Sequence, residues 1–181
     1  YEGDGVTKGW RDLGLKICGP LAKSLAAACD EMFAVADGGQ KIFARLRKPV
    51  TKNKAVESPE AELLLSTPSG KINPMKRALS RDLKRAKNVQ IICAYFLPTW
   101  KIRRDLRRVL RKGGRVQIIL PGKTDVPISQ MAARSLYRRM MQAGVEIYEY
   151  QPQILHAKMI VIDEVVYAGS ANLDQRSLNL N

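Results

Sequence analysis

Short apolar runs alternate with helix-like segments after residue 60, and this alternation constrains the fold more than any other feature. The expected strands cover residues 63–65, 89–95, 116–120 and 145–150. The expected helices cover residues 74–87, 99–111 and 130–142. Pro74 suits a first turn, Ser129 suits an N-cap, and glycines follow the last two helices. The pattern predicts an α/β fold with a mixed, largely parallel sheet and helices on both faces.

The first 60 residues follow a different pattern. Residues 12–18 alternate apolar and polar side chains like a strand, and residues 21–35, after Pro20, are apolar enough for a helix. Residues 36–60 contain paired glycines, prolines and many basic side chains without a clear period. We therefore expect a strand and a helix within 1–35, a linker at 36–60, and a larger α/β part at 61–181.

The only histidine of the 181 residues lies in the string H-A-K-M-I-V-I-D, which contains His156, Lys158 and Asp163. The string G-S-A-N follows soon after and contains Ser170 and Asn172. Side chains two apart on a strand share a face, so His156 should lie beside Lys158 and Ser170 beside Asn172. One short hairpin is therefore expected to gather a nucleophile or proton donor, a cation and two neutral hydrogen-bonding groups.

The loop of this hairpin decides whether the two pairs meet, because residues directly opposite each other on antiparallel strands share a face. A two-residue turn prefers a glycine that position 164 lacks, so we expect a three-residue loop at 163–165 or a one-residue bulge at Gly169. Either register places all four side chains on one face. Asp163 lies at the turn, where a carboxylate accepts backbone N–H bonds.

These residue types suit a phosphodiester, whose hydrolysis or transfer needs a nucleophile, an acid for the leaving oxygen, and cations around the non-bridging oxygens. Histidine as a residue type titrates near neutrality and can serve as base or acid. Lysine adds a compact charge, and serine and asparagine add neutral hydrogen bonds. The sequence lacks the clustered ligands of a zinc site, so we expect no metal and no other cofactor.

The string from residue 155 onward, with H-x-K-x4-D and a trailing G-S-x-N, resembles the motif of the phospholipase D superfamily, and in its longer form the second motif of bacterial cardiolipin synthases. The resemblance implies an α-β-α sandwich and a reaction through a phosphohistidine intermediate. It implies that His156 is the acid and base, or the nucleophile if two halves exchange roles. Lys158 and Asn172 would hold phosphate oxygens, while Ser170 and Asp163 would complete the set.

Members of this family place two such motifs face to face, one in each half, and this chain contains one. Residues 9–20, G-W-R-D-L-G-L-K-I-C-G-P, resemble the segment shortly after the first motif in two-motif members. The family usually continues the L-x-L-N run with an aromatic residue and a glutamate that orients an active-site histidine, whereas this sequence stops at Asn181. We expect a second half with the tail of a preceding half, inactive alone and dependent on another half in the same chain or a second subunit.

Lysine and arginine number 31 against 17 aspartate and glutamate, a net charge of +14. The helix expected from residue 99 has Arg103, Arg107 and Arg111 at intervals of four, and arginine binds phosphate bidentately. We expect an anion-binding surface there, against the alternative of solvated helix faces. An anionic membrane surface and nucleic acid both fit, because both carry phosphodiesters.

Three cysteines, odd in number and widely spaced among apolar neighbours, predict reduced core thiols and not a disulfide framework. No uncharged apolar run is long enough to span a bilayer. These patterns favour a cytoplasmic location or the cytoplasmic face of a membrane, and the resemblance implies a bacterial source.

The loop at Tyr95 and Phe96 follows a strand end, where α/β proteins place their sites, and family members have a similar aromatic-proline loop beside the pocket. Its aromatic side chains either border a pocket or simply pack in the core, and the sequence favours neither.

Taken together, the residues and the resemblance predict a phosphatidyltransferase or phosphodiesterase that acts on anionic phospholipid. Two alternatives stay open: a nuclease of the same superfamily acting as a homodimer, and a catalytically incomplete module that binds nucleic acid or a membrane surface. The segment 9–20 argues against the nuclease, because a one-motif nuclease would not need the tail of a preceding half.

Overall fold

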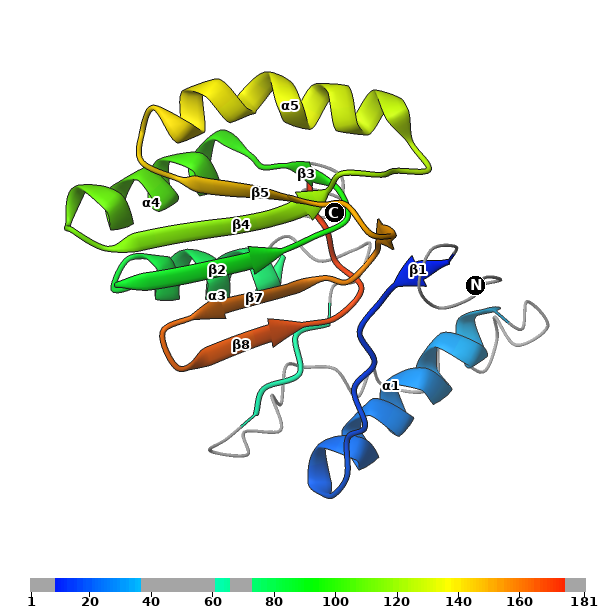
Figure 1. Cartoon of the computed structure of the whole chain (residues 1–181). Coiled ribbons are helices and arrows are strands. Elements are labelled where there is room, and N and C mark those ends of the chain that lie inside the picture. Colours follow the sequence, from blue (N-terminus) through cyan, green and yellow to red (C-terminus); the bar gives the residue numbers. More distant parts are fainter. Residues whose placement is uncertain (1–8, 37–60, 66–72, 175–181) are drawn as a thin grey trace. The chain divides into compact units, whose positions relative to one another are not determined.

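The computed structural model describes residues 9–36, 61–65 and 73–174 (Figure 1). It groups residues 1–14 with 66–181 in one compact unit and residues 15–65 in a second. No helix in the described ranges is long and apolar enough to cross a membrane.

The larger unit is built on a five-stranded mixed sheet with the strand order β5-β4-β2-β7-β8 (Figure 1). Its strands are β2 (Asn88–Ile92), β4 (Arg115–Pro121), β5 (Glu146–Tyr150), β7 (Met159–Ile162) and β8 (Val165–Ala168). The first three are parallel, and β7 and β8 are antiparallel additions. Two short parallel pairs complete the unit, β1 (Trp10–Arg11) with β6 (Ile154–Leu155) and β3 (Phe96–Leu97) with β9 (Leu173–Asp174).

Three helices connect these strands: α3 (Pro74–Leu83), α4 (Trp100–Arg111) and α5 (Pro127–Met141). The side chain of Asn73 accepts the N–H of Lys76 at 3.0 Å and caps α3, and Thr99 caps α4 in the same way. Helix α5 begins at Pro127, earlier than expected, so the prediction of Ser129 as its N-cap is wrong. Proline fixes the φ that a first helical turn needs, which explains the earlier start.

One hydrophobic cluster contains side chains of all three helices together with the inward-facing residues of β2, β4 and β7. The three helices therefore cover the same face of the sheet. The α/β class and the mixed, largely parallel sheet are confirmed. The second helical layer of the expected sandwich does not occur among the described residues of this unit.

Two polar links tie the helices together and to the edge strand. The buried carboxylate of Asp105 on α4 accepts the hydroxyl of Ser80 on α3 at 3.2 Å and pairs with Arg108 at 3.1 Å. The hydroxyl of Tyr167 on β8 donates to Asp82 on α3. Each link satisfies a polar group that would otherwise cost free energy in or near the core.

The smaller unit contains α1 (Pro20–Ala36), which agrees with the helix expected after Pro20. The strands expected at 12–18 and 63–65 were wrong, because the described backbone there is not strand. The expected linker falls largely outside the described residues, so the division of the chain at 35 and 60 stays a prediction. Cys93 is a buried thiol as expected, whereas Cys18 and Cys29 are exposed, which corrects the prediction of three core thiols.

Candidate active site

Strands β1 and β6 bring the start of the described chain to the histidine motif. Trp10 lies opposite Ile154 in their register, and the backbone N–H groups of His156 and Ala157 both donate to the carbonyl of Arg11, at 2.8 and 3.1 Å. These bonds fix the backbone on both sides of the histidine. They also place Asp12, the residue after β1, next to the imidazole.

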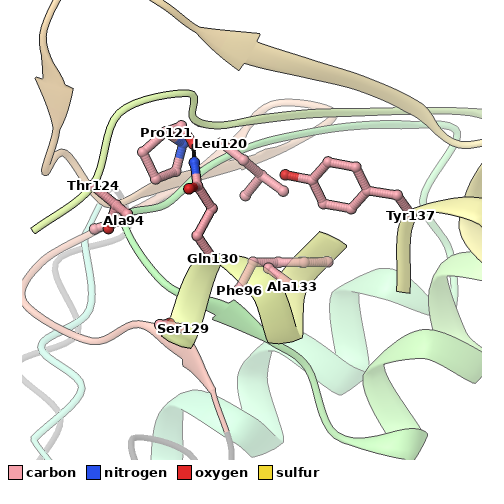
Figure 2. A pocket seen from close by; sticks show the side chains of 9 residues that line it. All are labelled: Ala94, Phe96, Leu120, Pro121, Thr124, Ser129, Gln130, Ala133 and Tyr137. Carbon is pink, nitrogen blue, oxygen red and sulfur yellow. Dashed lines mark hydrogen bonds between the residues drawn. The ribbon is translucent and has the colours of Figure 1, made fainter. Parts of the chain in front are cut away.

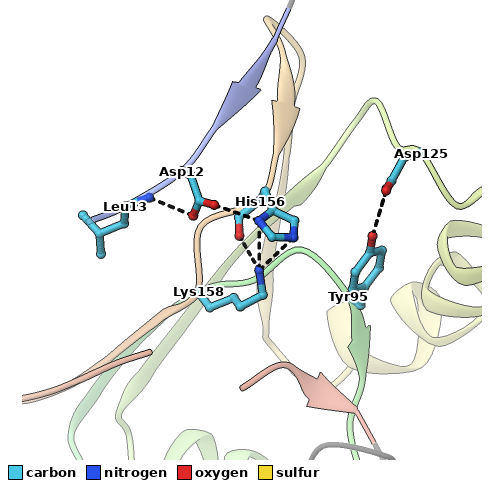
Figure 3. A network of polar contacts seen from close by, with 6 residues as sticks. All are labelled: Asp12, Leu13, Tyr95, Asp125, His156 and Lys158. Atoms are coloured by element: carbon cyan, nitrogen blue, oxygen red, sulfur yellow. Dashed lines mark hydrogen bonds and ion pairs between the residues drawn. The ribbon is translucent and has the colours of Figure 1, made fainter. Parts of the chain in front are cut away.

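The carboxylate of Asp12 lies 2.8 Å from Nδ1 of His156 (Figure 3). A carboxylate can only accept, so Nδ1 carries the proton and Nε2 of the neutral ring keeps its lone pair. The hydrogen bond from His156 lowers the pKa of Asp12 below its ordinary value of 3.8, so Asp12 stays ionised at neutral pH. The indole of Trp10 adds a ring contact to the imidazole at 4.7 Å between centroids.

The ammonium group of Lys158 lies 3.2 Å from each ring nitrogen of His156 and donates to its backbone carbonyl at 2.6 Å (Figure 3). Burial lowers the pKa of Lys158, and the charge of Asp12 opposes that effect. The structure therefore brings together His156 and Lys158, as their spacing predicted. It adds Asp12, for which the only sequence signal was the W-R-D string at 10–12.

Asp163 lies at the far end of β7 from this group. Its carboxylate accepts the backbone N–H groups of Lys87 at 3.1 Å and of Asn88 at 2.8 Å. Its own N–H donates to the carbonyl of Asn88 at 3.0 Å. The turn residue thus accepts backbone bonds as expected, and its side chain is not brought to His156.

We expect Asp163→Ala to lower the free energy of unfolding by about 1–3 kcal/mol, because two backbone donors lose their acceptor. Chemical denaturation followed by circular dichroism would measure this. Glu164→Ala, at the exposed neighbouring turn position, should stay within about 0.5 kcal/mol of the parent. A variant of Asp163 with unchanged stability and no activity would contradict this structural role.

The hairpin register differs from the prediction. Met159 pairs with Ala168 and Ile162 with Val165, which leaves a two-residue turn at Asp163 and Glu164. The expected three-residue loop is therefore wrong, because Asp163 itself adopts the positive φ, +50°, and no glycine is needed at the second position.

The bulge expected at Gly169 is also absent from the described ladder, which ends at Ala168. From Gly169 the chain leaves the hairpin and enters β9, so strand parity does not place Ser170 and Asn172. Ser170 is exposed, and the side-chain oxygen of Asn172 is buried without a hydrogen-bond partner. No described contact joins either residue to His156 or Lys158, and their phosphate-binding roles stay predictions.

The two aromatic residues of the loop after β2 have different surroundings. Phe96 is buried in the core, whereas the hydroxyl of partly buried Tyr95 donates to the carboxylate of Asp125, at 2.9 Å from Oδ1 (Figure 3). A cavity of about 10 Å³ lies behind this loop, between Phe96 and helix α5 (Figure 2). That volume holds at most one water, so it is not a substrate site.

Within the described ranges, no group of three histidine, cysteine or carboxylate side chains is arranged to hold a metal ion. The expected anion-binding arginines lie on α4, where Arg107 and Arg111 are exposed and Arg103 is partly buried.

Comparisons with known proteins agree with this fold and motif. The family described as "Cardiolipin synthase, PLD-like domain" matches residues 79–181. Cardiolipin synthase 1 of Bacillus cereus is 30% identical over 179 residues, which are 95% of this chain and 35% of that protein. Cardiolipin synthase B of Salmonella typhi is 38% identical over 109 residues, 59% of this chain and 26% of that protein.

Among solved structures, Nuc of Salmonella typhimurium, a phospholipase D family member, matches with a TM-score of 0.52 at 19% identity. The match covers 62% of this chain and 73% of that one, and shows a shared fold. The chain therefore belongs to the phospholipase D superfamily, in its cardiolipin synthase-like branch. It spans 35% and 26% of the lengths of the two curated relatives, so their names alone assign no activity to it.

Proposed function

We propose that this chain forms the second half of a phosphatidyltransferase that acts on anionic phospholipid. It would work with a first half that supplies another histidine, and the combination is called the two-half enzyme below. The observation that carries the proposal is one histidine with Nδ1 held by a carboxylate at 2.8 Å and a lysine ammonium 3.2 Å from Nε2. The names of the cardiolipin synthase relatives support a phospholipid substrate.

In the first step, the histidine of the other half attacks the phosphorus through a ring nitrogen, and the bond from phosphorus to the departing alcohol oxygen breaks. His156, protonated on both nitrogens, gives the Nε2 proton to that oxygen. The ammonium of Lys158 offsets charge on the non-bridging oxygens, and Asn172 would add a hydrogen bond with Ser170 in support.

In the second step, the acceptor hydroxyl gives its proton to Nε2 of the now neutral His156. The acceptor oxygen forms a bond to phosphorus, and the phosphorus–nitrogen bond breaks with its electron pair returning to the first histidine. Asp12 serves both steps, because its carboxylate holds the Nδ1 proton whether the ring is neutral or cationic.

The substrate class is tested by one assay of the two-half enzyme on phosphatidylglycerol vesicles and on single-stranded DNA, side by side. We expect release and transfer of the phosphatidyl group, with DNA cleavage no faster than in a His156→Ala control. Cleavage of DNA without lipid turnover would instead establish the nuclease. If neither substrate is turned over, the result would favour the alternative of a non-catalytic module that binds nucleic acid or a membrane surface.

The outer side of α4 and α5 supports a membrane partner for this enzyme. Helix α5 has no acidic residue, and Asp105, the one carboxylate of α4, is fully buried. Helix α5 also has exposed arginines, Arg138 and Arg139, and exposed apolar side chains at its start, where Ile128 is 81% and Met131 72% exposed. Exposed basic and apolar side chains both suit the surface of an anionic bilayer.

We expect the affinity of the two-half enzyme for phosphatidylglycerol vesicles to fall steeply with added salt, because ion pairing with lipid headgroups is screened. Arg107→Glu with Arg111→Glu should weaken binding at low salt by about tenfold or more. Vesicle co-sedimentation would measure both effects. Arg77→Glu with Arg85→Glu, an equal charge change at exposed positions on and after α3, is the matched control. Vesicle binding that does not depend on salt, or an equal loss of affinity in the control variant, would contradict a role for the α4 arginines in membrane binding.

A further inference from the structure

A carboxylate and a tyrosine lie across from the histidine and lysine in the candidate site. Tyr95 follows β2 and Asp125 follows β4, so both come from the carboxyl ends of neighbouring parallel strands, where α/β folds bind ligands. The Tyr95 hydroxyl lies 2.9 Å from Oδ1 and 3.1 Å from Oδ2 of Asp125. In the close view, this pair lies on the other side of His156 and Lys158 from Asp12 (Figure 3).

Two electrostatic effects relate the pair to the site. Burial raises the pKa of Tyr95 to about 12, with the bond to Asp125 acting in the same direction, so its hydroxyl keeps its proton at neutral pH. The negative charge of Asp125 also acts on Lys158, where it opposes the lowering of the lysine pKa by burial. Asp125 is therefore near the site and is held there by a neutral donor.

A carboxylate is unexpected at a site for a phosphodiester, because like charges repel. The repulsion is not cancelled by a direct ion pair, since none of the salt bridges among the described residues includes Asp125. Tyr95 supplies one proton to a group with about four lone-pair positions, so the exposed carboxylate keeps free acceptor capacity. The natural complement is a neutral molecule with O–H donors.

We infer that Asp125, oriented by Tyr95, binds the acceptor alcohol of the transfer reaction and selects a polyol with a second hydroxyl beside the reacting one. This inference rests on the proposed phosphatidyl transfer. During the step, the reacting hydroxyl loses its proton to Nε2 of His156 and bonds to phosphorus, and the phosphorus–nitrogen bond breaks with its electron pair returning to the first histidine. The neighbouring hydroxyl meanwhile donates to Asp125. Water has no second hydroxyl, so the same contact favours transfer over hydrolysis.

The test is the ratio of labelled phosphatidylglycerol, the transfer product, to phosphatidic acid, the hydrolysis product. The two-half enzyme would form both from a phosphatidylglycerol donor with isotopically labelled free glycerol as acceptor. Asp125→Asn should lower the ratio of transfer to hydrolysis by about tenfold or more, because a bond to a charged acceptor is lost. Tyr95→Phe should shift the ratio in the same direction by a smaller factor. Glu164→Gln, an exposed carboxylate at the distant turn of the hairpin, is the matched control and should leave the ratio unchanged.

A loss of rate without a change in the ratio would show that Asp125 acts only through the charge of Lys158 or the fold, and would overturn the inference. A parent enzyme that prefers ethanolamine to glycerol would also overturn it, because the carboxylate would then serve an ammonium group. These results differ from failure of the proposed function, in which the parent enzyme forms neither product.

Discussion

Replacing His156 with alanine is expected to reduce phosphatidyl turnover by the two-half enzyme by about 10²–10⁴-fold or more, the range typical for loss of a general acid or base. Nδ1 of the imidazole is occupied by Asp12, so Nε2 is the ring atom that can exchange a proton with the substrate, while the Lys158 ammonium beside it supplies a fixed charge. Release of the headgroup alcohol from phosphatidylglycerol, followed in single-turnover and steady-state assays, would measure the loss.

The control for this variant is its binding to lipid vesicles, which the substitution should not change. His156 is 25% exposed and its backbone N–H bond to Arg11 needs no side chain, so the alanine variant should keep its fold and its affinity for lipid vesicles. Residual turnover within tenfold of the parent would show that His156 is not the acid and base. Robust turnover by this chain as an isolated monomer, abolished by the same substitution, would contradict its dependence on a second half.

The helices were predictable from the sequence because each carries its own signals. Proline at 74, the side chain of Thr99 and glycines 113 and 144 mark boundaries that the structure retains within a few residues. The strands expected at 12–18 and 63–65 failed for the opposite reason. Alternation at 12–18 and the leucine run at 63–65 indicate only how the side chains of a strand would be buried, but a strand forms only where another strand supplies hydrogen bonds.

The predicted register of the hairpin was wrong because it assumed that the ladder between β7 and β8 continues as far as Ser170 and Asn172. Parity relates Lys158 to Ser170 only if the ladder continues past Ala168, and the chain instead leaves it to pair β9 with β3. That pairing is a tertiary contact between segments more than 70 residues apart, and no local sequence pattern predicts it. The proximity of His156 and Lys158 was predictable because they lie two residues apart.

The position of Asp12 also depends on a long-range strand pairing that local sequence patterns do not predict. It lies 144 residues before His156, and only the parallel pairing of β1 with β6 brings the two together. The resemblance of residues 9–20 to a family segment marked the region, but gave Asp12 no role. The geometry therefore leads to a second prediction that sequence patterns alone did not contain.

Asp12→Asn is expected to lower the turnover number by about 10²-fold or more with little change in KM. An amide can donate to Nδ1, which would move the ring proton to Nε2 and remove the lone pair that accepts the substrate proton. Steady-state kinetics with phosphatidylglycerol vesicles would separate the two constants. Trp10→Phe keeps an aromatic ring beside the imidazole and serves as the control for local packing. A raised KM at unchanged turnover would show that Asp12 acts on lipid binding.

The pH dependence gives an independent check. The folded-state pKa of Asp12 is lowered by His156, so the stabilising bond is fully present above the ordinary value of 3.8 and is lost only as the pH falls through the lower folded value. The parent enzyme should therefore keep its Asp12–His156 bond across the neutral and mildly acidic range. The pH profile of kcat over the range in which Asp12 stays ionised should then differ between the parent and Asp12→Asn, because only the variant lacks a fixed negative charge beside the imidazole. Identical profiles in this range would mean that the carboxylate does not act on His156 during turnover.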